Sequence, residues 1–300
     1  MQKLPFDLMA GAGWAKTIEH VRRLAAIPYL THIVAGSFTL DSRAGNTGGT
    51  NFDVLPDGTS TNSLGMPNGG GDYLLANLKE MVEIAHGASK KFVLNVAGFT
   101  WQEQIALITI AIKAGVDIIE ENWGCPNVYG ADKVQKGIIS YVREAMMQFV
   151  SFVEERFGAS IERWIKVSPT SNPADRVWIA DLFAKSSATT LVATNTFPNV
   201  YLTHGDGRPL LQVANGYGGM AGTALHWVAV SNARHYDELL RPHPDKKLIG
   251  SGGNNSYETS LDFLRIGQRM SGVQVSTAFF HREDPRVFRD IAEGWAAQQA

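Results

Sequence analysis

Residues 116–130 read V-D-I-I-E-E-N-W-G-C-P-N-V-Y-G, and this stretch decides the fold. Its first five residues form a short apolar run with one polar break, which is typical of a buried parallel strand. Polar residues follow at once, and Pro126 and Gly130 end any regular element. A core strand therefore leads directly into a loop that carries the only cysteine of the chain, Cys125.

The residue types in this loop are suited to catalysis and to ligand binding. A thiolate can act as a nucleophile or as a general base. The side chains of Asn122 and Asn127 offer donors and acceptors without charge, which suits a flat polar ring with imide groups. The alternative is a buried structural cysteine beside two loop-capping asparagines, because free cysteine often behaves as a small core residue. Residue types alone leave both interpretations open.

Outward from this stretch, short apolar runs alternate with amphipathic segments along the whole chain. The predicted strands lie near residues 6–10, 31–35, 92–96, 116–122, 164–167, 190–193, 247–250 and 272–276. The predicted helices lie near residues 17–27, 71–87, 101–114, 133–157, 174–186, 223–241, 256–268 and 284–298. Eight strands, each followed by a helix, predict an α/β fold, a single (β/α)8 TIM barrel domain over residues 1–300, with a doubly wound open sheet as the alternative. In such a barrel the active site lies at the C-terminal ends of the strands.

Composition narrows the class of protein. A chain of 300 residues with 44% hydrophobic content can bury a large core. The net charge of −2 is spread along the chain, so we expect no nucleic-acid or membrane surface. One cysteine excludes an internal disulfide and a self-contained Cys-ligated iron–sulfur cluster, and no metal site is predicted. With no signal peptide and no apolar span of membrane length, we expect a cytoplasmic protein.

Small and basic residues follow other predicted strands. Ala10 and Gly11 would let the backbone approach a flat ligand closely, or would simply form a tight turn. Lys166 lies inside an apolar strand, where its charge is costly unless it is paired. In a barrel it would point into the mouth, beside an anionic ring or as a Schiff-base former. A solvated lysine at a sheet edge is the alternative.

Three glycine or hydroxyl clusters suit a phosphate. Residues 216–222, G-Y-G-G-M-A-G, match a dinucleotide-binding pattern, but no strand leads into them and no βαβ unit surrounds them. We therefore predict a glycine loop that binds phosphate and leads into a helix at Thr223. The other clusters are 250–253 and 276–277, in the loops after strands seven and eight, where such barrels hold phosphates with backbone N–H groups.

The motifs also resemble a known family. N-W-G-C-P-N-V at residues 122–128 resembles the active-site stretch of class 1 dihydroorotate dehydrogenases. Residues 61–68, T-N-S-L-G-M-P-N, and the R-A-G-N at 43–46 resemble two further signatures of that family. The resemblance covers about residues 4–290. It implies an FMN-dependent barrel, a homodimer, and electron transfer to a fumarate-like acceptor or to a separate subunit.

The resemblance also implies roles for single residues. Cys125 would be the base that removes a proton beside a carbonyl while a hydride leaves for the flavin, and loop 123–135 would close over the site. The implied substrate contacts are Asn62, Gly65, Met66, Asn122, Asn127, Asn195 and Thr196. The implied flavin contacts are Ala10, Gly11, Ser37, Asn95, Asn122, Lys166, Gly218, Gly219, Gly222, Gly252, Gly253, Ser276 and Thr277.

The chain departs from the family at Gly36, where the family usually has a lysine near flavin and substrate. One hypothesis keeps dihydroorotate as substrate, with Arg43 or Lys166 replacing the charge. A second is a related FMN oxidoreductase acting on another cyclic or unsaturated carbonyl compound. A third is a flavin-free barrel that uses Lys166 as a Schiff base. Under the second hypothesis, Gly36→Lys should improve activity on dihydroorotate. Loop 197–215 receives no role.

Overall fold

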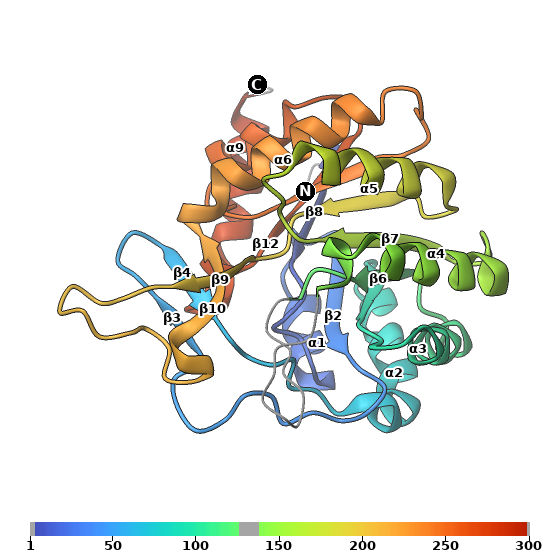
Figure 1. Cartoon of the computed structure of the whole chain (residues 1–300), viewed down its shortest axis with the longest axis horizontal. Coiled ribbons are helices and arrows are strands. Elements are labelled where there is room, and N and C mark those ends of the chain that lie inside the picture. The colour runs from blue at the N-terminus through green and yellow to red at the C-terminus, as the bar shows by residue number, and fades with distance from the viewer. Residues whose placement is uncertain (1–3, 126–137, 299–300) are drawn as a thin grey trace.

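Eight parallel strands close into a barrel in the computed structural model, which describes residues 4–125 and 138–298. The order around the barrel is β1-β12-β11-β8-β7-β6-β5-β2 (Figure 1). The strands are β1 (Asp7–Ala10), β2 (His32–Phe38), β5 (Lys91–Val96), β6 (Ile118–Asn122), β7 (Glu162–Val167), β8 (Thr190–Ala193), β11 (Lys247–Ser251) and β12 (Met270–Val275). The predicted (β/α)8 barrel is therefore confirmed, and each predicted strand matches one of these within a few residues.

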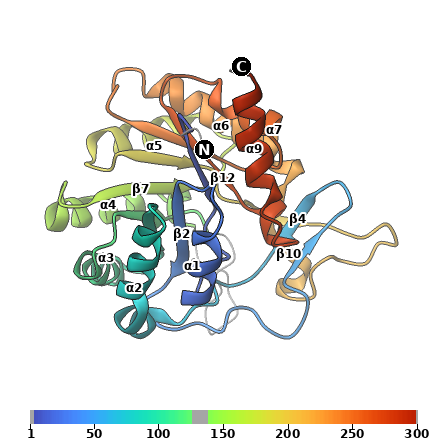
Figure 2. The same cartoon turned by 180° about the vertical axis from the view of Figure 1, so that it is seen from behind.

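Helices surround the barrel, as Figures 1 and 2 show from opposite sides. They are α1 (Ile18–Ala25), α2 (Gly70–Gly87), α3 (Trp101–Ala114), α4 (Arg143–Phe157), α5 (Pro173–Lys185), α6 (His226–Leu239), α7 (Tyr257–Leu264), α8 (Thr277–Phe280) and α9 (Arg286–Gln298). Local sequence sets their ends. The hydroxyl of Thr100 accepts a hydrogen bond from the backbone of Glu103 at the start of α3, and Gly115, with φ of 79°, ends that helix.

Three predicted helix boundaries need correction. The helix expected from residue 133 begins at Arg143 in the described part of the chain, after a 3-10 turn over Ile139–Tyr141. The helix expected from residue 223 starts with a 3-10 turn, so that α6 begins at His226. The helix expected to reach residue 268 ends at Leu264. Turns of this kind are common where a chain enters or leaves an α-helix.

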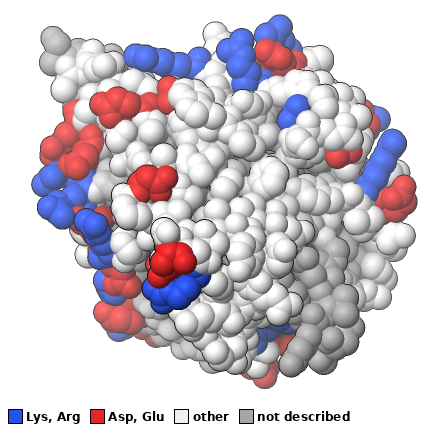
Figure 3. All heavy atoms as spheres, turned by 60° about the vertical axis from the view of Figure 1, so that its left-hand side comes forward, with Lys and Arg blue, Asp and Glu red and all other residues white. Residues whose placement is uncertain are grey.

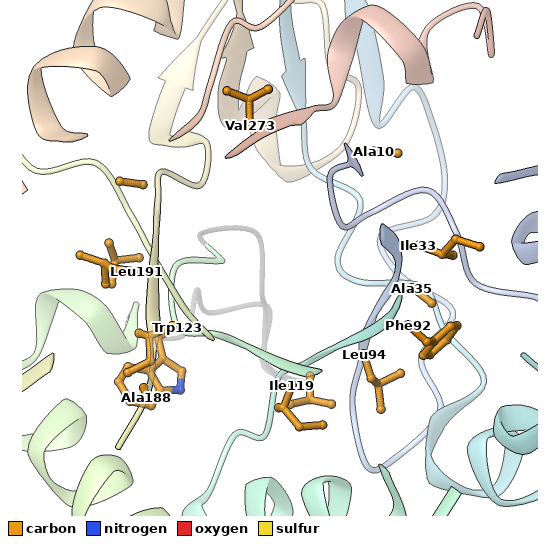
Figure 4. Close-up of a cluster of buried hydrophobic side chains, with 14 of the residues drawn as sticks. Ala10, Ile33, Ala35, Phe92, Leu94, Ile119, Trp123, Ala188, Leu191 and Val273 are labelled. Atoms are coloured by element: carbon orange, nitrogen blue, oxygen red, sulfur yellow. The ribbon is translucent and has the colours of Figure 1, made fainter. Parts of the chain in front are cut away.

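The barrel strands bury both of their faces. Figure 4 shows Leu94, Ile119, Leu191 and Val273 pointing outward from the strands, into the layer that the helices cover. A second cluster fills the inside of the barrel and consists of Met9, Val34, Val93, Ile118, Trp164, Val192 and Ile249. Because successive side chains of a strand point to opposite faces, each strand supplies both layers.

A small antiparallel sheet beside the barrel was not predicted. Its strands, in order across the sheet, are β3 (Phe52–Val54), β4 (Thr59–Asn62), β10 (Tyr217–Gly222) and β9 (Phe197–Tyr201) (Figure 1). The predicted glycine loop at 216–222 is therefore wrong, because most of it is strand β10. Its glycines permit close strand pairing: a Cβ at Gly222, whose φ is 70°, would clash with the carbonyl of Gly58. Loop 197–215 contributes β9 to this sheet.

Figure 3 shows Lys and Arg interspersed with Asp and Glu toward the edge of one face, with mostly uncharged atoms in its middle. Across residues 4–125 and 138–298, no helix has both the length and the apolar character needed to span a bilayer.

Candidate active site

A cavity of about 520 Å³ lies at the C-terminal ends of the barrel strands. The loops that follow the strands form most of its wall, which is where barrels of this kind carry their active sites. The small sheet closes one side with apolar side chains: Phe52, Val54, Leu55 and Pro56. The volume lies in the range of sites for small molecules and cofactors.

Most of the predicted site residues line this one cavity, although they come from distant parts of the chain. They are Ser37, Asn62, Gly65, Met66, Asn122, Cys125, Lys166, Asn195, Thr196, Gly222, Gly252, Gly253, Ser276 and Thr277. Asn127 and most of the predicted closing loop lie outside the described residues. The barrel therefore brings together side chains that follow almost every strand.

The remaining predicted contacts do not line the cavity: Ala10, Gly11, Asn95, Gly218 and Gly219. Ala10 is buried within β1, and a Cβ at Gly11 would clash with the hydroxyl of Ser276, so that glycine permits an internal contact. Ala12 and Gly13, the next two residues, line the cavity instead. Gly218 and Gly219 lie in strand β10.

Asn95 is the fifth of these residues, and its side chain is fully buried. Its Nδ2 donates to Oε1 of Glu120 at 2.6 Å, inside the barrel. Its Oδ1 is buried and accepts no hydrogen bond from the described residues. Asn95 is not among the residues that line the cavity, so its predicted flavin contact stays a prediction.

A chain of hydrogen bonds fixes the polar side chains at one end of the cavity. Nδ2 of Asn195 donates to Oδ1 of Asn122 at 2.9 Å, and Nδ2 of Asn122 donates to the hydroxyl of Ser37 at 2.8 Å. Ser37 lies near the end of β2, Asn122 ends β6, and Asn195 follows β8. Their amides are thus held in one orientation before any ligand arrives, which lowers the entropic cost of binding.

Cys125 lies beside this chain, partly exposed and packed against Met66, Ala97 and Phe99. Cys125 is therefore not part of the main barrel core. The alternative of a buried structural cysteine, which the sequence left open, does not apply. Its partial exposure is typical of the sites in which reactive cysteines are found.

Lys16 is a functional candidate that the sequence interpretation missed. It follows the small-residue loop after β1, lines the cavity, and donates from Nζ to the carbonyl oxygen of Ser37 at 2.8 Å. Burial lowers the pKa of Lys16 to about 7, and the nearby Cys125 thiolate opposes that shift. The signal in the sequence was the lysine at the end of A-G-A-G-W-A-K, which directly follows the first strand.

The backbone at Gly36 explains why no lysine side chain stands there. Its φ is 129°, and an added Cβ would lie 2.9 Å from Cβ of Asn95 and clash with the Asn95 carbonyl. A side chain at position 36 would be strained, which argues against the hypothesis that Gly36→Lys would improve activity. Of the cations considered as replacements, Lys166 lines the cavity, whereas Arg43 donates to the carbonyl of Gly65 and lies outside the lining.

Lys166 is 5% exposed, so it is a buried lysine of the barrel mouth and not a solvated edge residue. Its Nζ donates to Oε1 of Gln274 at 2.6 Å and lies 3.8 Å from Oε1 of Glu120. This carboxylate supplies the charge partner that a buried ammonium group requires.

The far end of the cavity combines glycine backbone with hydroxyl and basic side chains. Gly252 and Gly253 follow β11, and Ser276 and Thr277 follow β12. The hydroxyl of Thr277 lies 2.8 Å from that of Ser60, which links this end to the small sheet. Arg282 also lines the cavity. No cluster of His, Cys, Asp and Glu suited to a metal ion occurs in the described ranges.

Comparison with known proteins identifies the family. The family model for dihydroorotate dehydrogenase matches residues 2–298. The chain belongs to the dihydroorotate dehydrogenase family. The resemblance seen in the motifs is thereby confirmed, and the chain is an oxidoreductase of the type that acts on CH–CH bonds.

Individual relatives agree with this assignment. The chain is 29% identical to a probable dihydroorotate dehydrogenase A (fumarate) of Enterococcus faecalis, over 97% of this chain and 89% of the relative. It is 30% identical to the catalytic subunit of dihydroorotate dehydrogenase B (NAD(+)) of Anoxybacillus flavithermus, over 84% and 74% of the two chains. Of the hypotheses drawn from the sequence, these matches favour the dehydrogenase over both the second oxidoreductase and the Schiff-base barrel.

The fold is shared with a solved structure as well. The crystal structure of DHODH in complex with ferulenol from Eimeria tenella superimposes with a TM-score of 0.72. The match covers 95% of this chain and 79% of the other, at 18% sequence identity. At that identity the likeness concerns the barrel architecture alone.

Proposed function

We propose that this chain is an FMN-dependent dihydroorotate dehydrogenase, with one FMN-binding domain over residues 1–300, which oxidises (S)-dihydroorotate to orotate. One observation carries the proposal: Cys125, the fixed amides of Asn122 and Asn195, and two lysines converge in a single cavity. These groups suit the oxidation of an anionic cyclic amide at the carbon beside its carbonyl. That reaction requires a base, such as a thiol, together with neutral amides and cations.

The residues at the two ends of the cavity fit FMN. Lys166 provides a buried ammonium group where a flavin ring would lie, and the glycine and hydroxyl loops with Arg282 suit its phosphate. Gly252, with φ of 133°, brings backbone close to the cavity in a conformation that other residues rarely adopt. When bound, FMN supplies the acceptor for the hydride.

The chain's own residues would perform the remaining tasks. Cys125 removes the acidic proton next to the substrate carbonyl. Asn122 and Asn195 hold the ring through hydrogen bonds, together with Asn62 from the small sheet. Lys16 offers a positive charge to the carboxylate of dihydroorotate, so the charge absent at position 36 comes from the loop after β1.

The electron acceptor and the assembly are part of the same proposal. Relatives carry the names of a fumarate enzyme and of a catalytic subunit of an NAD(+) enzyme. We therefore propose a fumarate-like small molecule, or a separate electron-transfer subunit, as the acceptor. As the sequence predicts, we further propose a homodimer that acts in the cytoplasm, and size-exclusion chromatography with light scattering tests its mass.

Anaerobic reduction of the purified protein tests the proposal. The protein should be yellow, release one FMN per chain on denaturation, and bleach when (S)-dihydroorotate is added. Release of FAD, or a colourless protein that takes up no added FMN, would contradict the cofactor. A protein that keeps FMN but is not bleached by dihydroorotate would contradict the substrate alone.

A further inference from the structure

Lys166 and Glu120 do not form a direct hydrogen bond, although both are buried inside the barrel. Their nearest charged atoms, Nζ and Oε1, are 3.8 Å apart. That exceeds the 2.7–2.9 Å or so of a charge-assisted hydrogen bond between such groups. Gln274 on β12 lies between them: its Oε1 accepts from Lys166 at 2.6 Å, and its Nε2 donates to Oε2 of Glu120 at 2.5 Å.

Amide N–H groups occupy both oxygens of the Glu120 carboxylate. Oε2 accepts from Gln274, and Oε1 accepts from Nδ2 of Asn95 at 2.6 Å. The ammonium group of Lys166, a residue that lines the cavity, is therefore held by the neutral oxygen of Gln274. Glu120 and Gln274 are 0% and 1% exposed, so water does not screen these charges.

We propose that Gln274 is a positioning residue that keeps Lys166 apart from Glu120 and directs its ammonium group toward the bound flavin, thereby raising the flavin reduction potential. The proposal rests on the proposed binding of FMN. Gln274 touches neither the substrate nor the reacting atoms and acts through Lys166.

Two substitutions should shift the reduction potential in opposite directions. In Gln274→Met the ammonium group can pair directly with Glu120 and withdraw from the cavity, so reduced, anionic flavin loses a favourable charge. In Glu120→Gln the negative charge is removed, so it no longer offsets the positive potential that Lys166 produces at the cavity. The oxygen of the new amide at position 120 can still accept from Gln274. Its NH2 group can donate to Oδ1 of Asn95 once the Asn95 amide rotates, because that oxygen is buried without a partner among the described residues.

The midpoint potential of the bound FMN, measured anaerobically against a reference dye, tests the proposal. Gln274→Met should weaken the binding of reduced relative to oxidised flavin by roughly tenfold, which for a two-electron couple lowers the potential by about 30 mV. Glu120→Gln should raise it by a similar amount. A merely structural role would not predict shifts of opposite sign.

Gln104→Met is the matched control. Gln104 on α3 is also a fully buried glutamine, and its Nε2 donates at 3.0 Å to the buried carboxylate of Glu121, on the outer face of the same strand β6. It does not line the cavity. We expect a loss of stability and an unchanged flavin potential.

An unchanged potential in Gln274→Met, or shifts of the same sign in Gln274→Met and Glu120→Gln, would overturn the inference. If Gln274→Met does not retain FMN, the Glu120→Gln protein decides: a raised potential supports the inference, and an unchanged or lowered one overturns it. Wild-type protein that fails to bind FMN contradicts the proposed function instead, so the two failures are distinguishable.

Discussion

At the scale of single residues, Lys16 brings a cation to the cavity from a loop other than that of Gly36. A side chain added at Gly36 would clash with Asn95, whereas Lys16 reaches the neighbouring carbonyl of Ser37 from the loop after β1. A site can carry a positive charge although the charged residue stands elsewhere in the chain. Loss of the family lysine is therefore no argument against an anionic substrate.

Gly36→Ala should destabilise the protein, and Gly36→Lys should do so at least as much. Both place a Cβ against the carbonyl of Asn95 at a positive φ, for which strain of about 1–3 kcal/mol is typical. Urea unfolding measures the effect. Gly87→Ala in helix α2, where an added Cβ meets nothing within 4 Å, is the control and should be neutral or stabilising. Wild-type stability in Gly36→Ala would contradict this reading.

Lys16 should make orotate binding dependent on pH. With a pKa of about 7, its ammonium group is lost as the pH rises above 7, so affinity for the anion should fall by up to tenfold per unit. Lys16→Arg should bind with no such fall, because arginine stays charged, and Lys16→Met should bind weakly at every pH. Changes in the visible spectrum of the flavin report binding.

The other titratable groups near Lys16 need a control. Cys125 is excluded by making each measurement in a Cys125→Ala protein. His20 on α1 packs nearby, and burial lowers its pKa below the ordinary 6.5, away from the range above pH 7 in which Lys16 loses its charge. Lys79→Met, an exposed lysine on α2, is the matched control and should bind orotate like the parent protein. Equal pH dependence with and without Lys16→Arg in the Cys125→Ala background would exclude Lys16 as the source.

Cys125→Ala should retain the flavin and slow its reduction by dihydroorotate roughly a hundredfold or more, the usual scale for loss of a general base. Cys125→Ser should retain some activity, with its optimum moved to higher pH, since a hydroxyl ionises less readily than a thiol. Stopped-flow absorbance under anaerobic conditions measures both rates. Reduction of the alanine variant at the wild-type rate would rule out this role.

At the scale of elements, strand β6 shows how one strand serves two layers. Its two adjacent glutamates point to opposite faces. Glu120 faces the barrel interior with Gln274, whereas Glu121 faces outward to Arg163 on β7 at 2.9 Å. Arg163 is fully buried and also contacts Glu154 on α4, so it ties two strands and a helix together.

Arg163→Met should cost about 3–5 kcal/mol of stability, because it leaves the buried carboxylate of Glu121 without its charge partner. Burial already raises the pKa of Glu121, and Arg163 opposes that rise. Without Arg163 the folded-state pKa rises further, so the loss should be largest at neutral pH and should shrink as the pH falls through the raised folded-state pKa toward 4.5, where folded Glu121 is protonated with or without Arg163. Denaturant unfolding at several pH values measures this.

Arg234→Met is the control for that variant. Arg234 and Glu238 form an exposed pair one turn apart on α6, for which a few tenths of a kcal/mol are typical. A loss in Arg163→Met as small as in this control would show that the buried network contributes little.

At the scale of the whole molecule, the cavity joins the barrel to the small sheet. FMN should therefore stabilise the protein as a whole, by about 2.7 kcal/mol when its concentration is a hundred times its dissociation constant. Riboflavin at equal concentration should stabilise less, because it lacks the phosphate that the loops after β11 and β12 would bind. Thermal unfolding of flavin-depleted protein, with inorganic phosphate as control, compares them. Equal stabilisation by both flavins would argue against a phosphate site there.

The amino-acid sequence alone predicted the barrel and a substantial share of the residues that line the cavity. Barrel strands are buried on both faces, so their apolar runs are recognisable without tertiary information. Residues directly after such strands must meet at one end of a barrel, which is why Asn122, Cys125, Lys166 and Ser276 could be grouped although they lie far apart in the chain.

Only the tertiary structure decided the small sheet, the place of Lys16 and the partners of Lys166. Strand β10 is rich in glycine and pairs with β4, which lies more than 150 residues earlier, so no local pattern of apolar residues marks it. The contact of Lys16 with Ser37 and the bridge from Lys166 through Gln274 to Glu120 likewise join separate strands and loops. Such pairings depend on which side chains the closed barrel brings within hydrogen-bonding distance, and sequence spacing carries no information about that distance.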